Sequence, residues 1–137
     1  MLIIPAIDIL GGKVVRLFED RSREAPAICK RQGKYYLITS GCTGWAPNAA
    51  EYAMAASLFG PWDVLANPCR GDRSEETFGA QSTFILPVVG KPGKYIFMAD
   101  IWNKHNLSDS RYAWPPIRFN GDRLEIEWLD EWDLELL

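Results

Sequence analysis

Residues 33–40 (GKYYLITS) recur sixty positions later as residues 93–100 (GKYIFMAD), and this repeat decides the fold of the 137-residue chain. Each copy begins at a glycine and follows an apolar run, residues 25–30 before the first copy and 82–89 before the second. β-Branched and aromatic residues on both sides of a glycine-containing turn are typical of a β-hairpin. A repeat of this period that is made only of strands predicts the blades of a β-propeller or a related β-array.

The rest of the repeat region also favours strands. Residues 52–57 are expected to add a strand to the first blade, although their alanines would also suit a short helix. Residues 117–119 and 124–128 flank Asn120-Gly121-Asp122, a favourable hairpin turn. Residues 67–77 are polar and contain proline and glycine, so they are expected to form a loop between blades. The sequence therefore predicts an all-β fold with two to three blades of antiparallel strands.

The beginning of the chain has a different pattern. Residues 2–9 are an almost continuous apolar run, typical of a strand buried on both faces. Gly11-Gly12 then turns into a second expected strand. We therefore expect residues 1–18 to be a segment of separate origin and residues 19–137 to be the β-domain.

Composition excludes several classes of function. The net charge is −3, the pI is about 5.2, and no basic stripe is present, which disfavours a nucleic-acid partner. No apolar run approaches the roughly 20 residues that cross a bilayer, and the apolar N-terminus lacks the basic region of a signal peptide. Three cysteines without CxxC spacing and a single histidine, His105, argue against a zinc site, a disulfide framework and a histidine-based nucleophile system.

Two polar residues occupy matching places in the repeat. Glu24 precedes the first strand of the first blade, and Gln81 precedes the first strand of the second. The first strand of each propeller blade lines the central funnel, so both side chains are expected at one axial pocket. Hydrolysis of a glycosidic bond needs two such groups, one to donate a proton and one to activate water. Burial would raise the pKa of the Glu24 carboxyl and the neighbouring Arg23 would lower it, so the sequence leaves the direction open.

Two tryptophans follow the two hairpins. Trp45 lies in the loop after the first hairpin, and Trp102 lies after the second. Aromatic faces stack on the apolar faces of sugar rings, so a pair of loop tryptophans suits a carbohydrate cleft. Packing between the blades is an equally good interpretation of the pair.

Residues 23–28 (REAPAI) followed by residues 33–37 (GKYYL) resemble the general-acid blade of glycoside hydrolase family 43. There a glutamate in an E-[AG]-P setting precedes a strand, and a G-x-Y-Y-L strand follows. The resemblance covers about residues 21–137 and is greatest for the galactan 1,3-β-galactosidase branch. It continues through residues 39–41 (TSG), 43–45 (TGW), 60–62 (GPW), 81–83 (QST), 109–112 (DSRY) and the tail from Glu127.

This resemblance implies part of a five-bladed propeller that hydrolyses β-galactan or a related plant polysaccharide with inversion. It implies that Glu24 is the general acid and that Gln81 replaces the usual aspartate, as a base or as a group that positions water. Trp45, Trp102 and Arg111 would bind the substrate. No cofactor or catalytic metal is implied, and a structural calcium ion stays open. The family is often secreted or periplasmic, but the sequence leaves the location of this chain open.

Residues 1–18 resemble a different family, the ribotide isomerase of histidine biosynthesis. In that family the aspartate corresponding to Asp8 is a catalytic acid or base at the end of the first barrel strand. The match covers only this short segment, whereas the first blades of the family 43 propeller are absent. The chain is therefore expected to be a truncated or fused fragment.

Three functions remain open at this point: a glycosidase fragment, a non-catalytic carbohydrate-binding β-module and, remotely, a sugar-phosphate isomerase. An oligo- or polysaccharide is the expected partner in the first two. Because two or three blades leave open sheet edges, we also expect the chain to self-associate.

Overall fold

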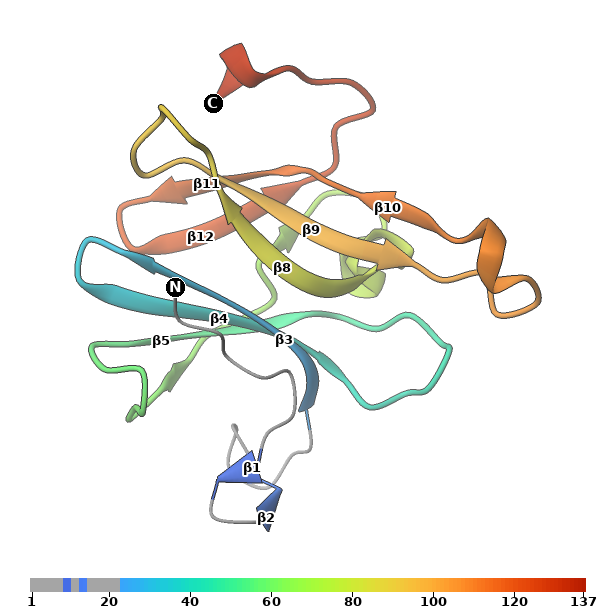
Figure 1. Cartoon of the computed structure of the whole chain (residues 1–137), viewed down its shortest axis with the longest axis horizontal. Helices are drawn as coiled ribbons and strands as arrows, with labels where there is room; N and C mark the ends of the chain where they lie inside the picture. Colours follow the sequence, from blue (N-terminus) through green and yellow to red (C-terminus); the bar gives the residue numbers. More distant parts are fainter. Residues whose placement is uncertain (1–8, 11–12, 15–22) are drawn as a thin grey trace.

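The chain folds into two main β-sheets, one of four and one of six strands and both largely antiparallel, that pack face to face (Figure 1). The computed structural model describes residues 9–10, 13–14 and 23–137. Within the described residues the helices are short 3₁₀ turns, and none could cross a bilayer. The all-β prediction is confirmed.

The first sheet, here called blade 1, has four strands in chain order. These are β3 (Arg23–Arg31), β4 (Lys34–Gly41), β5 (Glu51–Ala55) and β6 (Asp63–Val64). β3 and β4 form the hairpin predicted from the first repeat copy, with Gly33 at φ 80° in its turn, a backbone conformation that glycine adopts without strain. Of the two alternatives for residues 52–57, the strand is correct, because β5 pairs with β4 along its length.

The second sheet, blade 2, is built in the same way. It contains β8 (Gln81–Pro87), β9 (Tyr95–Ile101), β10 (Arg111–Ala113), β11 (Pro116–Asn120) and β12 (Arg123–Glu127). β10 and β11 follow one another along one side of β9, so they act as a single row of the sheet. The predicted turn joins β11 to β12. Blades 1 and 2 are the two blades that the repeat predicts.

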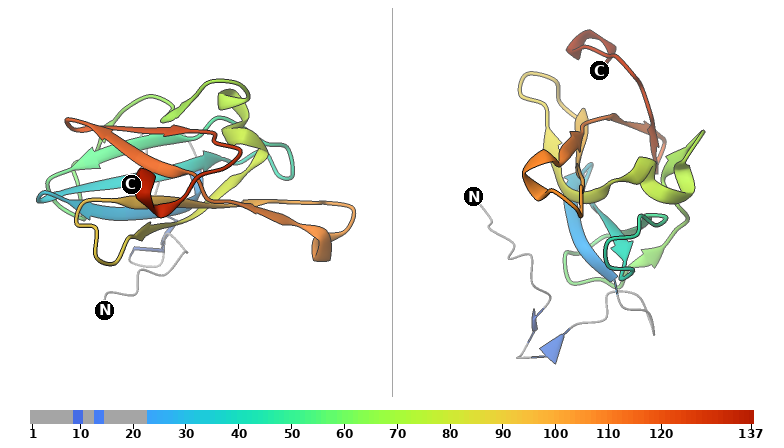
Figure 2. Two further views of the ribbon diagram at one scale, coloured as in Figure 1. Left: turned by 90° about the horizontal axis from the view of Figure 1, so that it is seen from above. Right: turned by 90° about the vertical axis from the view of Figure 1, so that its right-hand side faces the viewer.

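The main hydrophobic core lies between the blades. Tyr36 and Ile38 of blade 1 and Phe97 of blade 2 are each 0% exposed. The innermost strands, β3 and β8, lie side by side where the two sheets meet (Figure 2). Period-2 alternation along each strand places these residues on one face, which is why residues sixty positions apart meet in one core.

The segment expected to be a loop at residues 67–77 has more structure than predicted. It contains β7 (Cys69–Arg70), which pairs in parallel with β12, and the start of a 3₁₀ helix at Ser74–Gly79. Thr77 is 1% exposed, and its hydroxyl donates to the backbone oxygen of Asn48 and accepts from the backbone N–H of Ala50. The prediction missed this because both features depend on partners far away in the sequence.

Most of the N-terminal segment lies outside the described residues. The part that is described is a short antiparallel pair, β1 (Ile9–Leu10) with β2 (Lys13–Val14). Asp8 is outside the described residues. The proposed boundary between residues 18 and 19 stays a prediction.

Candidate functional site

The strand register brings Glu24 and Gln81 to the same end of the two blades. Glu24 is the second residue of β3 and pairs with Ser40 at the end of β4. Gln81 is the first residue of β8 and pairs with Asp100 at the end of β9. Since β3 and β8 are adjacent, both side chains reach the seam between the blades.

A hydrogen-bond network joins the two residues. The Gln81 Nε2 atom donates to Glu24 Oε1 at 2.9 Å and to Ser40 Oγ at 3.0 Å. The Gln81 Oε1 atom in turn accepts a hydrogen bond from Trp102 Nε1 at 3.1 Å. Gln81 therefore uses both ends of its amide, and it links a carboxylate of blade 1 to an indole of blade 2.

Both inner strands bend just after the candidate residue. The β3–β4 register shifts between Glu24 and Ala27, and the β8–β9 register shifts between Ser82 and Phe84. Ala25 has φ 54°, a left-handed conformation that costs energy for a residue with a side chain. Pro26 has no N–H to donate, and a bulge is one of the few places in a sheet where proline is tolerated. The sequence Ala25-Pro26 thus aims Glu24 across the seam.

The Arg23 side chain binds to Thr39 of the neighbouring strand β4. Its guanidinium donates to Thr39 Oγ1 at 3.1 Å and to the Thr39 backbone oxygen at 3.0 Å. It also lies 3.9 Å from Glu51. Successive residues of a strand face opposite ways, so Arg23 and Glu24 are neighbours in sequence but serve opposite faces of blade 1.

The two loop tryptophans touch each other at the mouth of this site. The ring centroids of Trp45 and Trp102 are 6.0 Å apart at 75°, an edge-to-face contact. The rings are 56% and 45% exposed. Asn48 braces the Trp45 loop, because its side chain exchanges two hydrogen bonds with the backbone of Gly41. The pair therefore packs across the blades and still presents aromatic surface to solvent.

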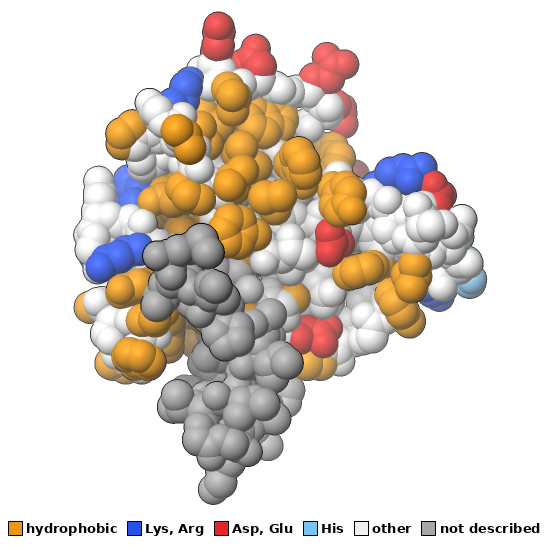
Figure 3. Space-filling model, viewed as in Figure 1, with side chains coloured by type: hydrophobic (Ala, Val, Ile, Leu, Met, Phe, Trp, Pro, Cys, Tyr) orange, Lys and Arg blue, Asp and Glu red, His pale blue; other side chains and the backbone are white. Residues whose placement is uncertain are grey.

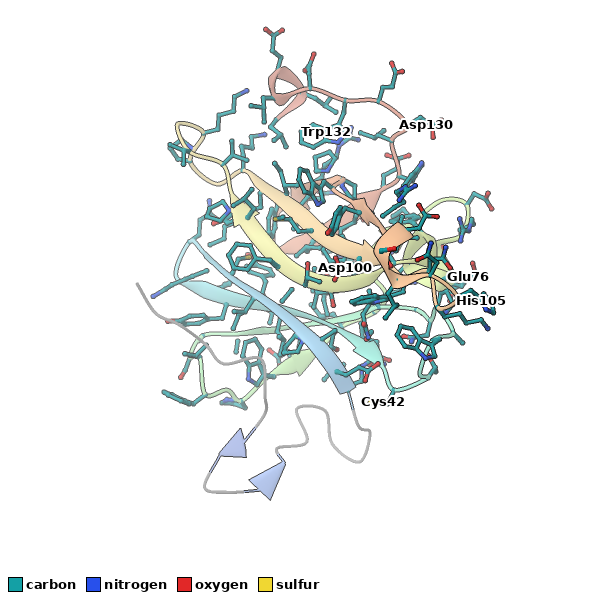
Figure 4. All side chains as sticks on the ribbon, turned by 45° about the vertical axis from the view of Figure 1, so that its right-hand side comes forward. Cys42, Glu76, Asp100, His105, Asp130 and Trp132 are labelled. Carbon is teal, nitrogen blue, oxygen red and sulfur yellow. The ribbon has the colours of Figure 1, made fainter. Side chains whose placement is uncertain are left out.

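Arg111 lies apart from the network. It is the first residue of β10, opposite Ile101, and its side chain forms an exposed ion pair with Asp109. The part of the chain that the structure describes shows no hydrogen bond from Arg111 to Glu24 or Gln81. His105 is exposed and lies in the loop after β9 (Figure 4).

Three further residues at this end were not singled out from the sequence. Ser40 accepts from Gln81, and Asp100 lies opposite Gln81 (Figure 4). Burial raises the pKa of the Asp100 carboxyl. Cys42 is exposed, but partial desolvation of its thiol raises the pKa of that group. The negative charge of Glu24 is a further cause of the raised pKa. The repeat contained part of this signal, since it aligns Ser40 with Asp100.

A separate hollow lies away from this site. A cavity of about 650 Å³ is lined by the two hairpin turns, at Gln32 and Gly93, and by Arg118. These turns are at the opposite end of the strands from Glu24, so this cavity is not part of the site. Among the described residues no group of three or more acidic, histidine or cysteine side chains could hold a metal ion.

Solved structures of known proteins resemble this chain closely. A GH43 β-1,3-galactosidase solved with galactodeoxynojirimycin is 50% identical, with a TM-score of 0.78 over 82% of this chain and 32% of that chain. An exo-β-1,3-galactanase from Clostridium thermocellum is 43% identical, with a TM-score of 0.67 over 76% of this chain and 23% of that one. The galactanase of Phanerochaete chrysosporium, solved with β-1,3-galactotriose, is 36% identical, with a TM-score of 0.68 over 76% of this chain and 23% of that one.

The chain therefore spans a third or less of the length of these structures. These relatives are five-bladed propellers, so the described residues form a partial propeller. No protein-family model matches the chain, and no curated protein matches it at a significant level. Nothing in these comparisons supports the isomerase interpretation of residues 1–18.

Proposed function

Because residues 23–137 are a portion of a glycoside hydrolase family 43 propeller of the β-1,3-galactosidase type, we propose that the chain carries the proton-donor side of a site for β-1,3-linked galactan. In this proposal Glu24 donates a proton to the oxygen of the leaving sugar. The observation that carries it is the bond from Gln81 to Glu24, which holds the carboxyl at the meeting point of two inner strands. A carboxyl placed there can reach a sugar on the propeller axis.

Gln81 serves in this proposal to position Glu24 and water rather than as the base. Inverting glycosidases separate their acid and base by roughly 6.5–9.5 Å to leave room for the sugar and a water molecule. The 2.9 Å contact between Gln81 and Glu24 is far shorter than that. Gln81 would have to rotate away from Glu24 before it could stand on the other side of a substrate, whereas as a positioning residue it can act from its present place.

The exposed tryptophans would hold the galactan chain. Trp45 and Trp102 offer aromatic surface beside Glu24, and mostly apolar pockets with a few placed polar groups are typical of ligand sites. Arg111 stays a proposed substrate contact at greater distance. The carbohydrate partner itself is inferred from the relatives, which were solved with galactose-type ligands.

The test measures galactose released from β-1,3-galactan. We expect release by the wild-type chain and a loss of about 10²–10⁴-fold in rate for Glu24→Gln, the usual contribution of a general acid. Glu127→Gln is the matched control, since Glu127 is an exposed glutamate on β12 paired with Arg118. A Glu24→Gln variant as fast as the wild type would remove Glu24 from the mechanism.

The second candidate, a carbohydrate-binding module without turnover, rests on the same tryptophan pair. Both rings are exposed, and the chain covers only 32% of the β-1,3-galactosidase that it matches. Retarded migration of the chain in a galactan-containing gel, abolished by Trp45→Ala and without galactose release, would establish the module in place of the enzyme.

A further inference from the structure

The side-chain amide of Gln81 has hydrogen-bond partners at both of its ends. The Nε2 atom donates to Glu24 Oε1 and to Ser40 Oγ, at 2.9 Å and 3.0 Å, so both of its protons are used. The Oε1 atom accepts from Trp102 Nε1 at 3.1 Å. The hydrogen bonds therefore run in one direction, from the Trp102 indole through the Gln81 amide to the Glu24 carboxyl.

Trp102 is the partner that decides which way the Gln81 amide is turned. A glutamine amide can turn by 180°, which exchanges its carbonyl oxygen with its NH₂ group at nearly the same positions. The Ser40 hydroxyl could bond to either group, and so could Glu24, because a protonated carboxyl donates and an ionised one accepts. An indole N–H can only donate. In the turned amide the Gln81 NH₂ group would face the Trp102 N–H, and two donors cannot bond to each other.

The orientation of the amide matters because a general acid must offer its proton to the substrate. A protonated carboxyl group carries its proton on one oxygen, and an N–H donor binds to the other. Gln81 Nε2 donates to Glu24 Oε1, so the proton belongs on Glu24 Oε2. In the turned amide the Gln81 carbonyl would instead accept the Glu24 proton and hold it away from a sugar.

We propose that Trp102 is a positioning residue for proton donation, because its N–H keeps the Gln81 amide turned so that Glu24 Oε2 is free to donate. This inference rests on the proposed function of Glu24. The proton passes from Glu24 Oε2 to the glycosidic oxygen, which keeps the electron pair of the bond that breaks. Glu24 becomes a carboxylate in this step. The bond from Gln81 Nε2 strengthens as that charge develops, so it favours the transition state over the bound substrate.

Trp45 provides a matched comparison for Trp102. The two rings are in contact, with centroids 6.0 Å apart, and both offer aromatic surface to solvent. Among the described residues, Trp102 donates to Gln81 and Trp45 has no part in the hydrogen bonds of that amide. A role in stacking on a sugar is therefore shared by both tryptophans, whereas a role in orienting Gln81 belongs to Trp102.

The first test compares Trp102→Phe with Trp45→Phe in the release of galactose from β-1,3-galactan by the full chain. Phenylalanine keeps an aromatic ring but has no N–H, so both variants lose a similar part of the stacking surface and should change KM by similar factors. We expect Trp102→Phe also to lower kcat by about 3–10-fold, which corresponds to one net hydrogen bond. In a Gln81→Met background, which has no amide to turn, Trp102→Phe should lower kcat no further.

The second test does not need turnover. Nuclear magnetic resonance of the ¹⁵N-labelled chain measures how fast the Gln81 side-chain amide protons exchange with water. We expect exchange in Trp102→Phe to be about threefold or more faster than in the wild type, because the turned amide loses its bonds to Glu24 and Ser40. Trp45→Phe should exchange at the wild-type rate.

Two results would overturn the role of Trp102. One is a kcat of Trp102→Phe that equals the wild-type value or that falls equally in the Gln81→Met background. The other is equal exchange of the Gln81 amide protons in the wild type and both variants. A wild-type chain that releases no galactose would overturn the proposed function instead, and the exchange rates alone would then decide whether Trp102 orients Gln81.

Discussion

Blade 1 and blade 2 share one repeat, but the same repeat position meets a different environment in each. Ile38 in blade 1 is 0% exposed within the core, whereas Met98 is only half-buried on the face of blade 2 that is turned away from blade 1, here called the open face (Figure 3). Ser40 in blade 1 accepts a hydrogen bond from Gln81, whereas Asp100, its counterpart, lies at the end of the open face. The difference shows that the shared sequence determines where the strands form in each blade. Which residues of a blade contribute most to the free energy of unfolding depends on what packs against that blade.

The largest expected effect separates the two members of a repeat pair. Ile38→Ala should lower the free energy of unfolding by about 2–5 kcal/mol, because it leaves a cavity in the core between the blades. Met98→Ala removes a side chain of similar size from the open face and should cost less than about 1 kcal/mol. Guanidinium unfolding, at a concentration where light scattering finds a monomer, measures both. Equal costs would mean that the open face is covered within the single chain.

The next effect concerns the bridge between the blades. Gln81→Ala should lower the free energy of unfolding by about 1 kcal/mol, since it removes a bond to a charged group that is partly open to solvent. A double-mutant cycle with Glu24→Ala should give a coupling energy of about 0.5 kcal/mol or more. The control cycle pairs Gln81→Ala with Glu127→Ala on β12 and should be additive. Additivity in the first cycle would show that the two side chains do not depend on each other.

Much of this arrangement could be predicted from the sequence because it is periodic. The repeat placed Glu24 and Gln81 at the start of equivalent strands, and the structure brings them within hydrogen-bonding distance. The alternation of side chains along a strand depends only on the geometry of that strand, so it can be predicted without knowing which other strands lie beside it. The position of Trp102 after the second hairpin was predicted on the same grounds.

Other parts could not be predicted because they depend on contacts between distant segments. β7 is two residues long and exists through its parallel pairing with β12. The bond from the Trp102 indole to Gln81 depends on how the loop after β9 leaves the sheet. In both cases the deciding interaction has no signature in the local sequence pattern. Arg111 is a different case, because it was assigned through family resemblance and its ion-pair partner is the sequence neighbour Asp109.

The smallest expected effect tests the last repeat pair, Ser40 and Asp100. Burial raises the pKa of the Asp100 carboxyl, so the folded state holds this proton to a higher pH than the unfolded state does. The free energy of unfolding therefore falls as the pH rises from the ordinary aspartate pKa of about 3.9 through the raised value. Asp100→Asn removes this loss. The variant should gain stability over the wild type across that pH window, by less than about 1 kcal/mol because the carboxyl is partly in solvent.

Ser40→Ala supplies the comparison, since a serine at the equivalent position does not titrate. Its effect on the free energy of unfolding should be the same at every pH in the window, through the lost bond to Gln81. Urea unfolding of the three proteins at a series of pH values separates the two patterns. If the free energy of unfolding of Asp100→Asn had the same pH dependence as that of the wild type, the Asp100 carboxyl would be as well hydrated in the folded chain as in the unfolded chain. A difference in the free energy of unfolding between Asp100→Asn and the wild type that grows with pH would instead show that the Asp100 carboxyl is partly desolvated in the single folded chain.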